Sequence, residues 1–308
     1  MNLSLRTMGY FVAAARNESL SKAAQVVGVS QSAISVAVDA MEEELGLRLF
    51  HRQRSKGVSL TASGRDVLVR IQAILDQVED FKAEMGGRSQ DISGDLHVAC
   101  FSPIAPIVLT PIMKSFVKAY PTVRINILEG NVRHVFDCVH RGEADVGISY
   151  DEADISAGLS HELLAVVPPH VVVPAHHAFA ALDDVSLTQL ATKPLILLDL
   201  PSSREYYSSL FETAGIKPNF VYRSGNYEMV RSLVGAGLGF ALLQSRPPEQ
   251  MTYSGARVVC KPLSEETRKS KLMIAYSAHS EKRRAVTTFV AHAREWFKSR
   301  EACHIIVS

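Results

Sequence analysis

The sequence predicts an α/β protein in three parts: a small helical unit with a β-hairpin, a long linker helix and two α/β lobes. Short amphipathic helices occupy the first part, a heptad repeat follows, and from residue 94 short β-branched runs alternate with helices. The chain has 308 residues, of which 47% are hydrophobic and 21% charged. This size and composition are typical of a globular protein with more than one core.

Charge and cysteine content exclude several classes of protein. Thirty-three Lys and Arg against 32 Asp and Glu leave a net charge of +1, so any basic patch must be local. The four cysteines form no CxxC pair and no zinc-like spacing with histidine, so we expect no disulfide scaffold, metal or cofactor. Charged residues interrupt the N-terminal apolar run, and no run approaches the ~18 residues of a membrane span. We therefore expect a cytoplasmic protein with no membrane partner.

The N-terminal residues predict three short helices. Apolar residues at helical spacing place the first at about 3–16. Ser21 is predicted to cap a second helix, Lys22–Val27, which stops at the following glycine. Ser30 is placed to cap a third helix, from Gln31 to about Leu45. Two short helices joined by a glycine-containing turn form a helix-turn-helix.

The third helix is predicted to turn a polar face outward. Its outward residues are Gln31, Ser32, Ser35, Val36 and Asp39. Gln and Ser can hydrogen-bond base edges, and an exposed Val can contact a thymine methyl group. An ordinary helical hairpin with a polar face would present the same residues, so the neighbouring sequence has to decide between the two.

A local basic block follows the third helix. Between Leu45 and Arg65 there is no Asp or Glu, and the basic and histidine residues are Arg48, His51, Arg52, Arg54, Lys56 and Arg65. Such a block beside a helix-turn-helix indicates phosphate binding. The segment Gln53–Gly57 between two short apolar runs predicts a β-hairpin. Together the pieces predict a winged helix-turn-helix.

Five ordered segments of this region form a specific signature. They are Leu20–Ala24, Val29–Ser35, Met41–Gly46, Leu49–Arg52 and Leu60–Gly64. Together they resemble the LysR-type transcriptional regulators. The resemblance and the helical pattern place DNA contacts in residues 1–60, at Ser30, Gln31, Ser32, Ser35, Val36, Arg52, Arg54 and Lys56. Those on the third helix would bind in the major groove, and the basic wing residues would hold phosphates or enter the minor groove. The chain departs from many members at Val36 and Ala37, where they carry a basic residue.

A heptad pattern predicts the linker helix at 61–86. Its apolar or small positions are Leu60, Gly64, Val67, Ile71, Ile74, Val78, Phe81 and Met85. A long helix with one narrow apolar seam needs a partner, which favours dimerisation over packing on its own domain. A dimer also suits a two-fold DNA site. A glycine-containing hinge is predicted at 87–93.

The remaining chain, 94–303, is predicted to form two α/β lobes. The first set has strands at 96–101, 123–129 and 144–149 and helices at 106–120 and 132–141. The second has strands at 171–173, 195–198, 219–222 and 239–243 and helices at 204–214 and 228–235, before a strand at 271–276 and a helix at 281–298. Crossing segments near 165–170 and 262–270 separate lobe I (94–165 and 267–303) from lobe II (166–266). The arrangement resembles a periplasmic-binding-protein clamp, which the LysR-type regulators use as an effector-binding domain.

Ligands of such sheets bind at the carboxyl ends of strands, near helix N-termini. The polar residues predicted there are Ser102, Asn131, Ser149, Tyr150, Ser202, Ser203, Arg204 and Ser224. Ser102, Ser149 and Ser202 also fall where the resemblance implies effector contacts. For a single serine a helix cap is the better interpretation, whereas convergence of the set on a cleft favours a ligand. Arg204 would bind a ligand carboxylate, or else pair with Asp199 or Glu205.

Three other classes fit less well. An enzyme is disfavoured because no GxSxG motif occurs, and Gly235–Gly239 follows a helix and leads into a strand, the wrong order for a dinucleotide loop. A free-standing solute receptor would leave residues 1–90 unexplained. A redox sensor would need a reactive thiol pair, whereas Cys100 and Cys138 fall in a predicted strand and helix, where burial makes a thiol inert.

The function predicted is therefore sequence-specific regulation of transcription. The expected partners are double-stranded promoter DNA, a small-molecule effector carrying a carboxylate, and further copies of the chain in a dimer or tetramer. RNA polymerase is a further candidate partner. A ligand-independent repressor is compatible with the same features.

Overall fold

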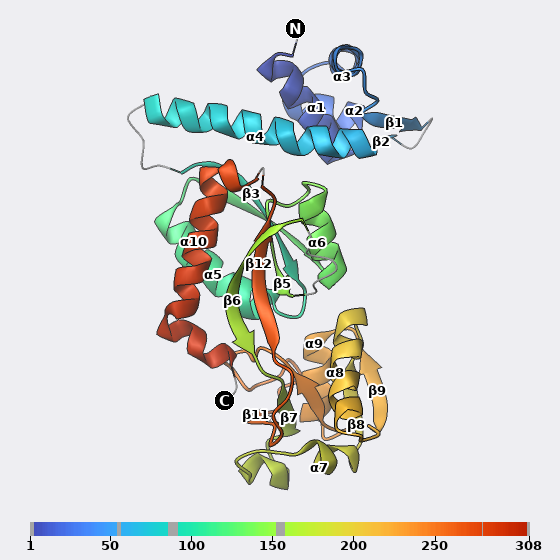
Figure 1. Ribbon diagram of the computed structural model, residues 1–308, viewed down its shortest axis with the longest axis vertical. Helices are drawn as coiled ribbons and strands as arrows, with labels where there is room; N and C mark the ends of the chain where they lie inside the picture. The colour runs from blue at the N-terminus through green and yellow to red at the C-terminus, as the bar shows by residue number, and fades with distance from the viewer. Residues whose placement is uncertain (1–2, 54–56, 86–91, 152–157, 279, 307–308) are drawn as a thin grey trace.

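The structure is a computed structural model that describes residues 3–53, 57–85, 92–151, 158–278 and 280–306. The chain extends along one axis, with the N-terminal unit at one end, the linker helix below it, then a central and a terminal lobe (Figure 1). The C-terminal residues return to the junction of the two lobes, where Arg246 donates its N–H to the Ile305 carbonyl at 3.0 Å.

The N-terminal unit is a helix-turn-helix followed by a β-hairpin, as predicted. Its elements are α1 (Leu5–Asn17), α2 (Leu20–Val27), α3 (Gln31–Leu45), β1 (Phe50–Gln53) and β2 (Gly57–Leu60). Gly28 ends α2 with φ 73°, a left-handed conformation that favours glycine. The predicted cap of α2 was wrong. Ser19 accepts the N–H of Lys22, and Ser21 lies within the first turn of the helix.

A buried carboxylate joins α3 to the hairpin. Glu42 is only 5% exposed and accepts the backbone N–H groups of Leu49 at 2.7 Å and Phe50 at 3.0 Å. Arg48 donates to its other oxygen at 3.0 Å. Burial alone would raise the pKa of Glu42, but the two N–H groups and the guanidinium hold this pKa below its ordinary value. The hairpin is thereby fixed relative to the third helix.

The linker helix is α4 (Ala62–Met85), and its apolar seam divides into two halves. Leu68 and Ile71 are buried against the N-terminal unit, at 4% and 5% exposure. Farther along, Ile74 is 40% and Phe81 60% exposed. Packing on the chain's own domain therefore accounts for the first half of the heptad pattern and leaves the second half uncovered. The predicted hinge at 87–93 lies mostly outside the described residues.

Lobe I is built on a five-stranded sheet in the order β4-β3-β5-β12-β6. Its strands are β3 (Gly94–Phe101), β4 (Val123–Gly130), β5 (Val146–Tyr150), β6 (Ser160–Val167) and β12 (Ser270–Tyr276). The first three strands are parallel, and β12 runs antiparallel to β5 and β6. The helical segments are η1 (Ala105–Leu109), α5 (Thr110–Ala119), α6 (Val132–His140), η3 (Ser280–Lys282), α10 (Arg284–Lys298) and η4 (Arg300–Ile305).

Two features of lobe I differ from the prediction. The single helix predicted at 106–120 is a π-helical turn, η1, followed by α5, and each has a proline in its first turn. Proline has no N–H to donate, which makes the start of a helix its natural position. Strand β6 was not predicted, because it extends into the predicted crossing segment near 165–170; its Leu163 is 49% exposed.

Lobe II contains two small sheets. The antiparallel sheet has the order β10-β7-β11, and the parallel pair is β8-β9. The strands are β7 (His170–Pro174), β8 (Leu195–Leu198), β9 (Phe220–Ser224), β10 (Ala241–Leu243) and β11 (Val258–Pro262). The helical segments are η2 (Ala178–Ala181), α7 (Leu187–Ala191), α8 (Pro201–Thr213) and α9 (Tyr227–Gly235). Strand β11 was not predicted, and α8 begins three residues earlier than predicted, because Pro201 is already in its first turn.

The three parts of the chain touch at defined points. The Arg16 guanidinium of α1 lies 3.8 Å from the Asp95 carboxylate of β3. A Cβ atom on Gly142 would lie 2.2 Å from Val69 of α4, so glycine allows the linker to rest on lobe I. Among the described residues, no helix is long and apolar enough to cross a membrane.

Candidate DNA-binding surface and inter-lobe cleft

Helix α3 presents the predicted polar face to solvent. Gln31, Ser32 and Val36 are exposed, Val36 to 68%, and Ser35 is half-buried. On the opposite face Ile34 and Val38 are completely buried. Ser30 is the predicted N-cap, and its hydroxyl accepts the N–H of Ala33 at 3.2 Å. The helix is therefore anchored by one face and free to enter a groove with the other.

Two hydrogen bonds order the polar side chains on this face. The Ser21 hydroxyl of α2 donates to Gln31 Oε1 at 2.8 Å. The Ser35 hydroxyl donates to Asp39 Oδ2 at 3.4 Å. These bonds restrict the side chains before any ligand arrives.

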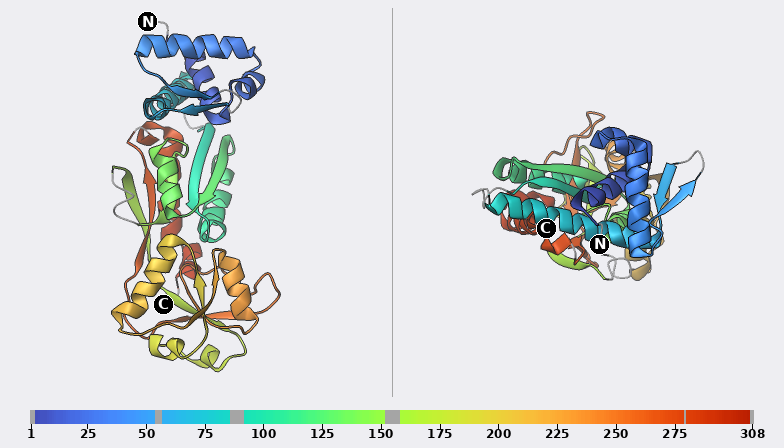
Figure 2. Two further views of the ribbon diagram at one scale, coloured as in Figure 1. Left: turned by 90° about the vertical axis from the view of Figure 1, so that its right-hand side faces the viewer. Right: turned by 90° about the horizontal axis from the view of Figure 1, so that it is seen from above.

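The β1–β2 hairpin projects from the body of the molecule beside α3 (Figure 2). Val58 donates its N–H to the Glu18 carbonyl at 3.0 Å, which ties the hairpin to the turn between α1 and α2. Gly57 has φ 84°, and a Cβ atom there would lie 2.3 Å from the same carbonyl oxygen. Arg52 belongs to β1, whereas the predicted contacts Arg54 and Lys56 lie outside the described residues.

A cleft of about 490 Å³ lies between the lobes. It is lined by Phe101, Val132, Tyr150, Asp151, Ser202, Ser203, Glu205, Tyr206, Gln244, Arg268, Lys269, Ser270 and Lys271. Of the predicted effector residues, the structure brings Tyr150, Ser202 and Ser203 together here. The cleft thus combines the end of β5, the first turn of α8 and the beginning of β12.

The other predicted effector residues do not line this cleft, and most have partners of their own. Ser102 donates to the Gly130 carbonyl at 3.2 Å, and Asn131 caps α6. Ser224 accepts the N–H of Asn226 at 3.2 Å, and Arg204 pairs with Asp199, as one of the alternatives foresaw. Ser149 is completely buried, and its hydroxyl has no hydrogen-bond partner among the described residues.

The sequence analysis missed the basic side of the cleft. Arg268, Lys269 and Lys271 line the cleft together with Asp151 and Glu205, so cations outnumber carboxylates in the lining. The signal was the basic segment Arg268–Lys271, which begins in the predicted crossing segment 262–270 and ends at the first residue of the predicted strand 271–276. Only the pairing of β12 with β5 and β6 places that segment beside the end of β5.

The first turn of α8 adds a favourable field for an anion. Leu200 occupies the N-cap position of α8, and its apolar side chain cannot accept a hydrogen bond from the backbone N–H groups of the first turn. Ser202 and Ser203 follow Pro201 in this turn and line the cleft. The dipole of a helix attracts negative charge to its N-terminus. An anionic ligand would therefore meet both this helix end and the basic side chains.

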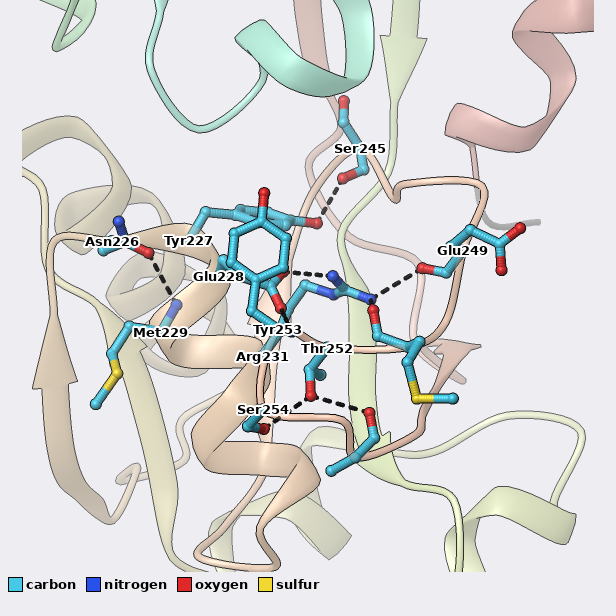
Figure 3. A network of polar contacts seen from close by, with 12 residues as sticks. Asn226, Tyr227, Glu228, Met229, Arg231, Ser245, Glu249, Thr252, Tyr253 and Ser254 are labelled. Carbon is cyan, nitrogen blue, oxygen red and sulfur yellow. Dashed lines mark hydrogen bonds and ion pairs between the residues drawn. The ribbon is translucent and has the colours of Figure 1, made fainter.

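One wall of the cleft is hydrogen-bonded to the segment that follows β10, beside the crossing segment near 165–170. Tyr150 shares a 2.8 Å bond with the Ser245 hydroxyl, and Tyr227 donates to the Ser245 carbonyl at 2.7 Å. Ser245 is completely buried with φ 53°, an uncommon conformation for a residue other than glycine. Nearby, the buried Arg231 pairs with Glu228 and donates to the Glu249 carbonyl at 3.0 Å (Figure 3).

Comparisons with known proteins match both the N-terminal and the C-terminal part of the chain. The family model of the LysR substrate binding domain matches residues 89–298. The model of the bacterial regulatory helix-turn-helix protein, lysR family, matches residues 5–65. The uncharacterized HTH-type transcriptional regulator YnfL of Escherichia coli (strain K12) is 28% identical over 297 residues, covering 95% of this chain and 98% of that protein.

Solved structures give the same result. HinK, a LysR family transcriptional regulator from Pseudomonas aeruginosa, is 32% identical with a TM-score of 0.63, over 96% of this chain and 99% of that chain. Full-length CbnR complexed with its target DNA is 21% identical with a TM-score of 0.56, over 96% and 100%, and shares the fold.

A helix-turn-helix joined through a long helix to a two-lobed ligand-binding domain defines a transcriptional regulator that responds to a small molecule. This chain belongs to the LysR family of transcriptional regulators. Its C-terminal part is the periplasmic-binding-protein-like effector domain of that family.

Proposed function

We propose that α3 and the hairpin bind promoter DNA through the residues predicted from the sequence. Gln31, Ser32, Ser35 and Val36 would contact base edges in the major groove, from a helix that Ser30 caps. Arg52, Arg54 and Lys56 would hold phosphates or enter the minor groove. The observation that carries this assignment is the exposed polar face of α3, whose opposite face is completely buried.

A gel shift on the DNA upstream of the chain's own gene, with competitor DNA and a salt series, tests the assignment. Changing Ser35→Ala should weaken binding at particular base pairs by about 1–3 kcal/mol. Changing Arg54→Ala should weaken binding to all DNA sequences. It should also lower the salt slope, the dependence of log affinity on log salt concentration, by about one. An unchanged salt slope for Arg54→Ala would remove the hairpin from the interface.

We also propose that the exposed half of α4 pairs with a second copy of the chain. An apolar groove of about 420 Å³ continues this seam and is lined by Leu3, Met8, Leu45, Leu47, Ser63, Asp66, Val67, Arg70, Ile71 and Ile74. The proposed division is 1–60 for DNA binding, 61–86 for dimerisation, 87–93 for the hinge and 94–303 for effector binding. Further pairing of effector domains would give a tetramer.

The effector, we propose, is a small molecule with a carboxylate that binds in the inter-lobe cleft. The excess of cations and the uncapped first turn of α8 support an anion. Binding would shift an equilibrium between two lobe arrangements, and only a difference in affinity between them can alter DNA binding.

A panel of small carboxylic acids, screened by thermal shift on the full-length protein, tests this proposal. An acid that stabilises the protein should lose its effect in the Arg268→Ala/Lys271→Ala double variant. The control is Lys217→Ala, which removes an exposed charge from another part of lobe II. Equal stabilisation of the double variant would place the ligand elsewhere.

The regulatory role also supports three broader proposals. The chain catalyses no reaction, acts in the cytoplasm and contacts RNA polymerase at its promoters. Purified polymerase added to the protein on promoter DNA should give a complex larger than polymerase–DNA or protein–DNA alone. Separate gel shifts of these two binary complexes, with no larger complex, would contradict the contact.

A further inference from the structure

Ser21 and Gln31 come from different helices and meet on the proposed DNA-binding face. Ser21 lies in the first turn of α2, and Gln31 is the first residue of α3. The Ser21 hydroxyl donates to Gln31 Oε1 at 2.8 Å, and both residues are exposed. The hydrogen bond therefore fixes a side chain without contributing to a core.

In the structure this bond is made to the carbonyl end of the amide, so the NH₂ end faces outward. A free glutamine on a surface can present either its carbonyl oxygen or its NH₂ group to the groove. With Oε1 held toward α2, Nε2 and its two N–H donors are directed away from Ser21. The major-groove edge of a purine offers N7 as an acceptor, and guanine adds O6.

The backbone at Gln31 is held by other contacts. Ser30 caps α3 by accepting the N–H of Ala33, and its hydroxyl also shares a 2.9 Å bond with Ser32. Ile34, on the next turn, is completely buried. Loss of the Ser21 hydroxyl should therefore release the Gln31 side chain without moving the helix.

We propose that Ser21 is a specificity-determining positioning residue, which orients the Gln31 amide so that Nε2 donates to an acceptor on a purine edge. The proposal rests on the proposed DNA-binding function. Ser21 acts through Gln31 and needs no base contact of its own. Preorganisation of this kind restricts the side chain before DNA is bound, so less conformational freedom is lost in the complex.

The test is selection of DNA from a library of randomised duplexes by the full-length protein, followed by sequencing. The variants are Ser21→Ala, Gln31→Ala, the double variant and Ser21→Thr, which keeps a hydroxyl. Ser254→Ala, which removes an exposed hydroxyl from lobe II, is the matched control. Thermal unfolding of each variant checks that the fold is intact.

We expect Ser21→Ala and Gln31→Ala to lose about tenfold discrimination at the same base pair of each half-site. The double variant should be no worse than Gln31→Ala, because the two residues act as one unit, and Ser21→Thr should restore the preference. If the Ser21→Ala variant selects the same motif as the wild-type protein, this inference is overturned and the proposed function stands. Uniform weakening of binding to all sequences would also overturn it, since Ser21 would then hold a phosphate. No motif for the wild-type protein would overturn the proposed function as well.

Discussion

At the scale of single residues, Glu42 links the recognition helix to the wing. Its carboxylate accepts two backbone N–H groups at the start of β1 and an Arg48 N–H, although it is only 5% exposed. A buried carboxylate is tolerable when such donors compensate for lost hydration. This side chain therefore holds the start of the hairpin against α3, and the Val58–Glu18 bond holds its second strand.

Changing Glu42→Gln should loosen the start of the hairpin by about 1–2 kcal/mol at neutral pH, because a neutral amide replaces an ion in these hydrogen bonds. The pKa of Glu42 is lowered in the folded protein. Its contribution is thus present above the unfolded pKa and is lost as the pH falls through the folded value. Hydrogen exchange of Leu49 and Phe50 should be faster in the variant at neutral pH, with a smaller difference in acid. An equal difference at both pH values would contradict this account.

The cysteines should differ in reactivity. Burial raises the pKa of Cys100 well above its ordinary value and that of Cys138 to about 11, whereas Cys303 is exposed. Only the thiolate is nucleophilic, so a thiol reagent should label Cys303 in the native protein and reach Cys100 and Cys138 on unfolding. Rapid native labelling of Cys138 would reopen the redox interpretation.

At the scale of elements, local sequence patterns predicted the helices and turns whose formation depends on residues close together in the chain. The caps and glycine turns of α2 and α3 and the heptads of α4 are encoded within one or two helical turns. Strands β6 and β11 were missed, although each contains a short apolar run, because both extend into the predicted crossing segments near 165–170 and 262–270. Arg268 and Lys271 were missed because only sheet pairing brings β12 to the cleft. The sequence thus predicted the exposed polar face of α3 and only part of the cleft lining.

The exposed half of α4 carries the prediction for assembly. Phe81→Asp should break the dimer, because a carboxylate would replace a 60% exposed phenyl ring in an apolar interface. Leu238→Asp, at a 42% exposed site in lobe II, is the control. Analytical ultracentrifugation should show the mass of a dimer or tetramer falling in the first variant and unchanged in the second. A Phe81→Asp protein of unchanged mass would exclude pairing through this helix.

At the scale of the whole molecule, a chain of contacts runs from the cleft to the lobe junction. Tyr150 lines the cleft and bonds to Ser245, which lies beside the crossing segment, where Gln244 donates to the Val167 carbonyl at 3.3 Å. On the other side, lobe I carries the linker through Gly142 and Val69. Lobe I therefore contacts both the cleft and the linker helix that leads to the DNA-binding unit.

Tyr150→Phe should loosen the lobe junction, because it removes the partner of a completely buried hydroxyl. Residues 244–246 should exchange their amide hydrogens about tenfold faster, a change of about 1.4 kcal/mol. Tyr120→Phe, a half-buried tyrosine in lobe I, should leave that segment unchanged. Identical exchange in Tyr150→Phe and wild type would remove Tyr150 from the junction.

The central claim is that this chain is a DNA-binding regulator whose two-fold assembly presents two copies of α3. Sequencing of randomised duplexes retained by the wild-type protein, at a salt concentration that suppresses nonspecific binding, tests it most directly. The account predicts an enriched motif with two related half-sites whose centres are about one helical turn, or a multiple of it, apart. Recovery of sequences no different from the input library would contradict it.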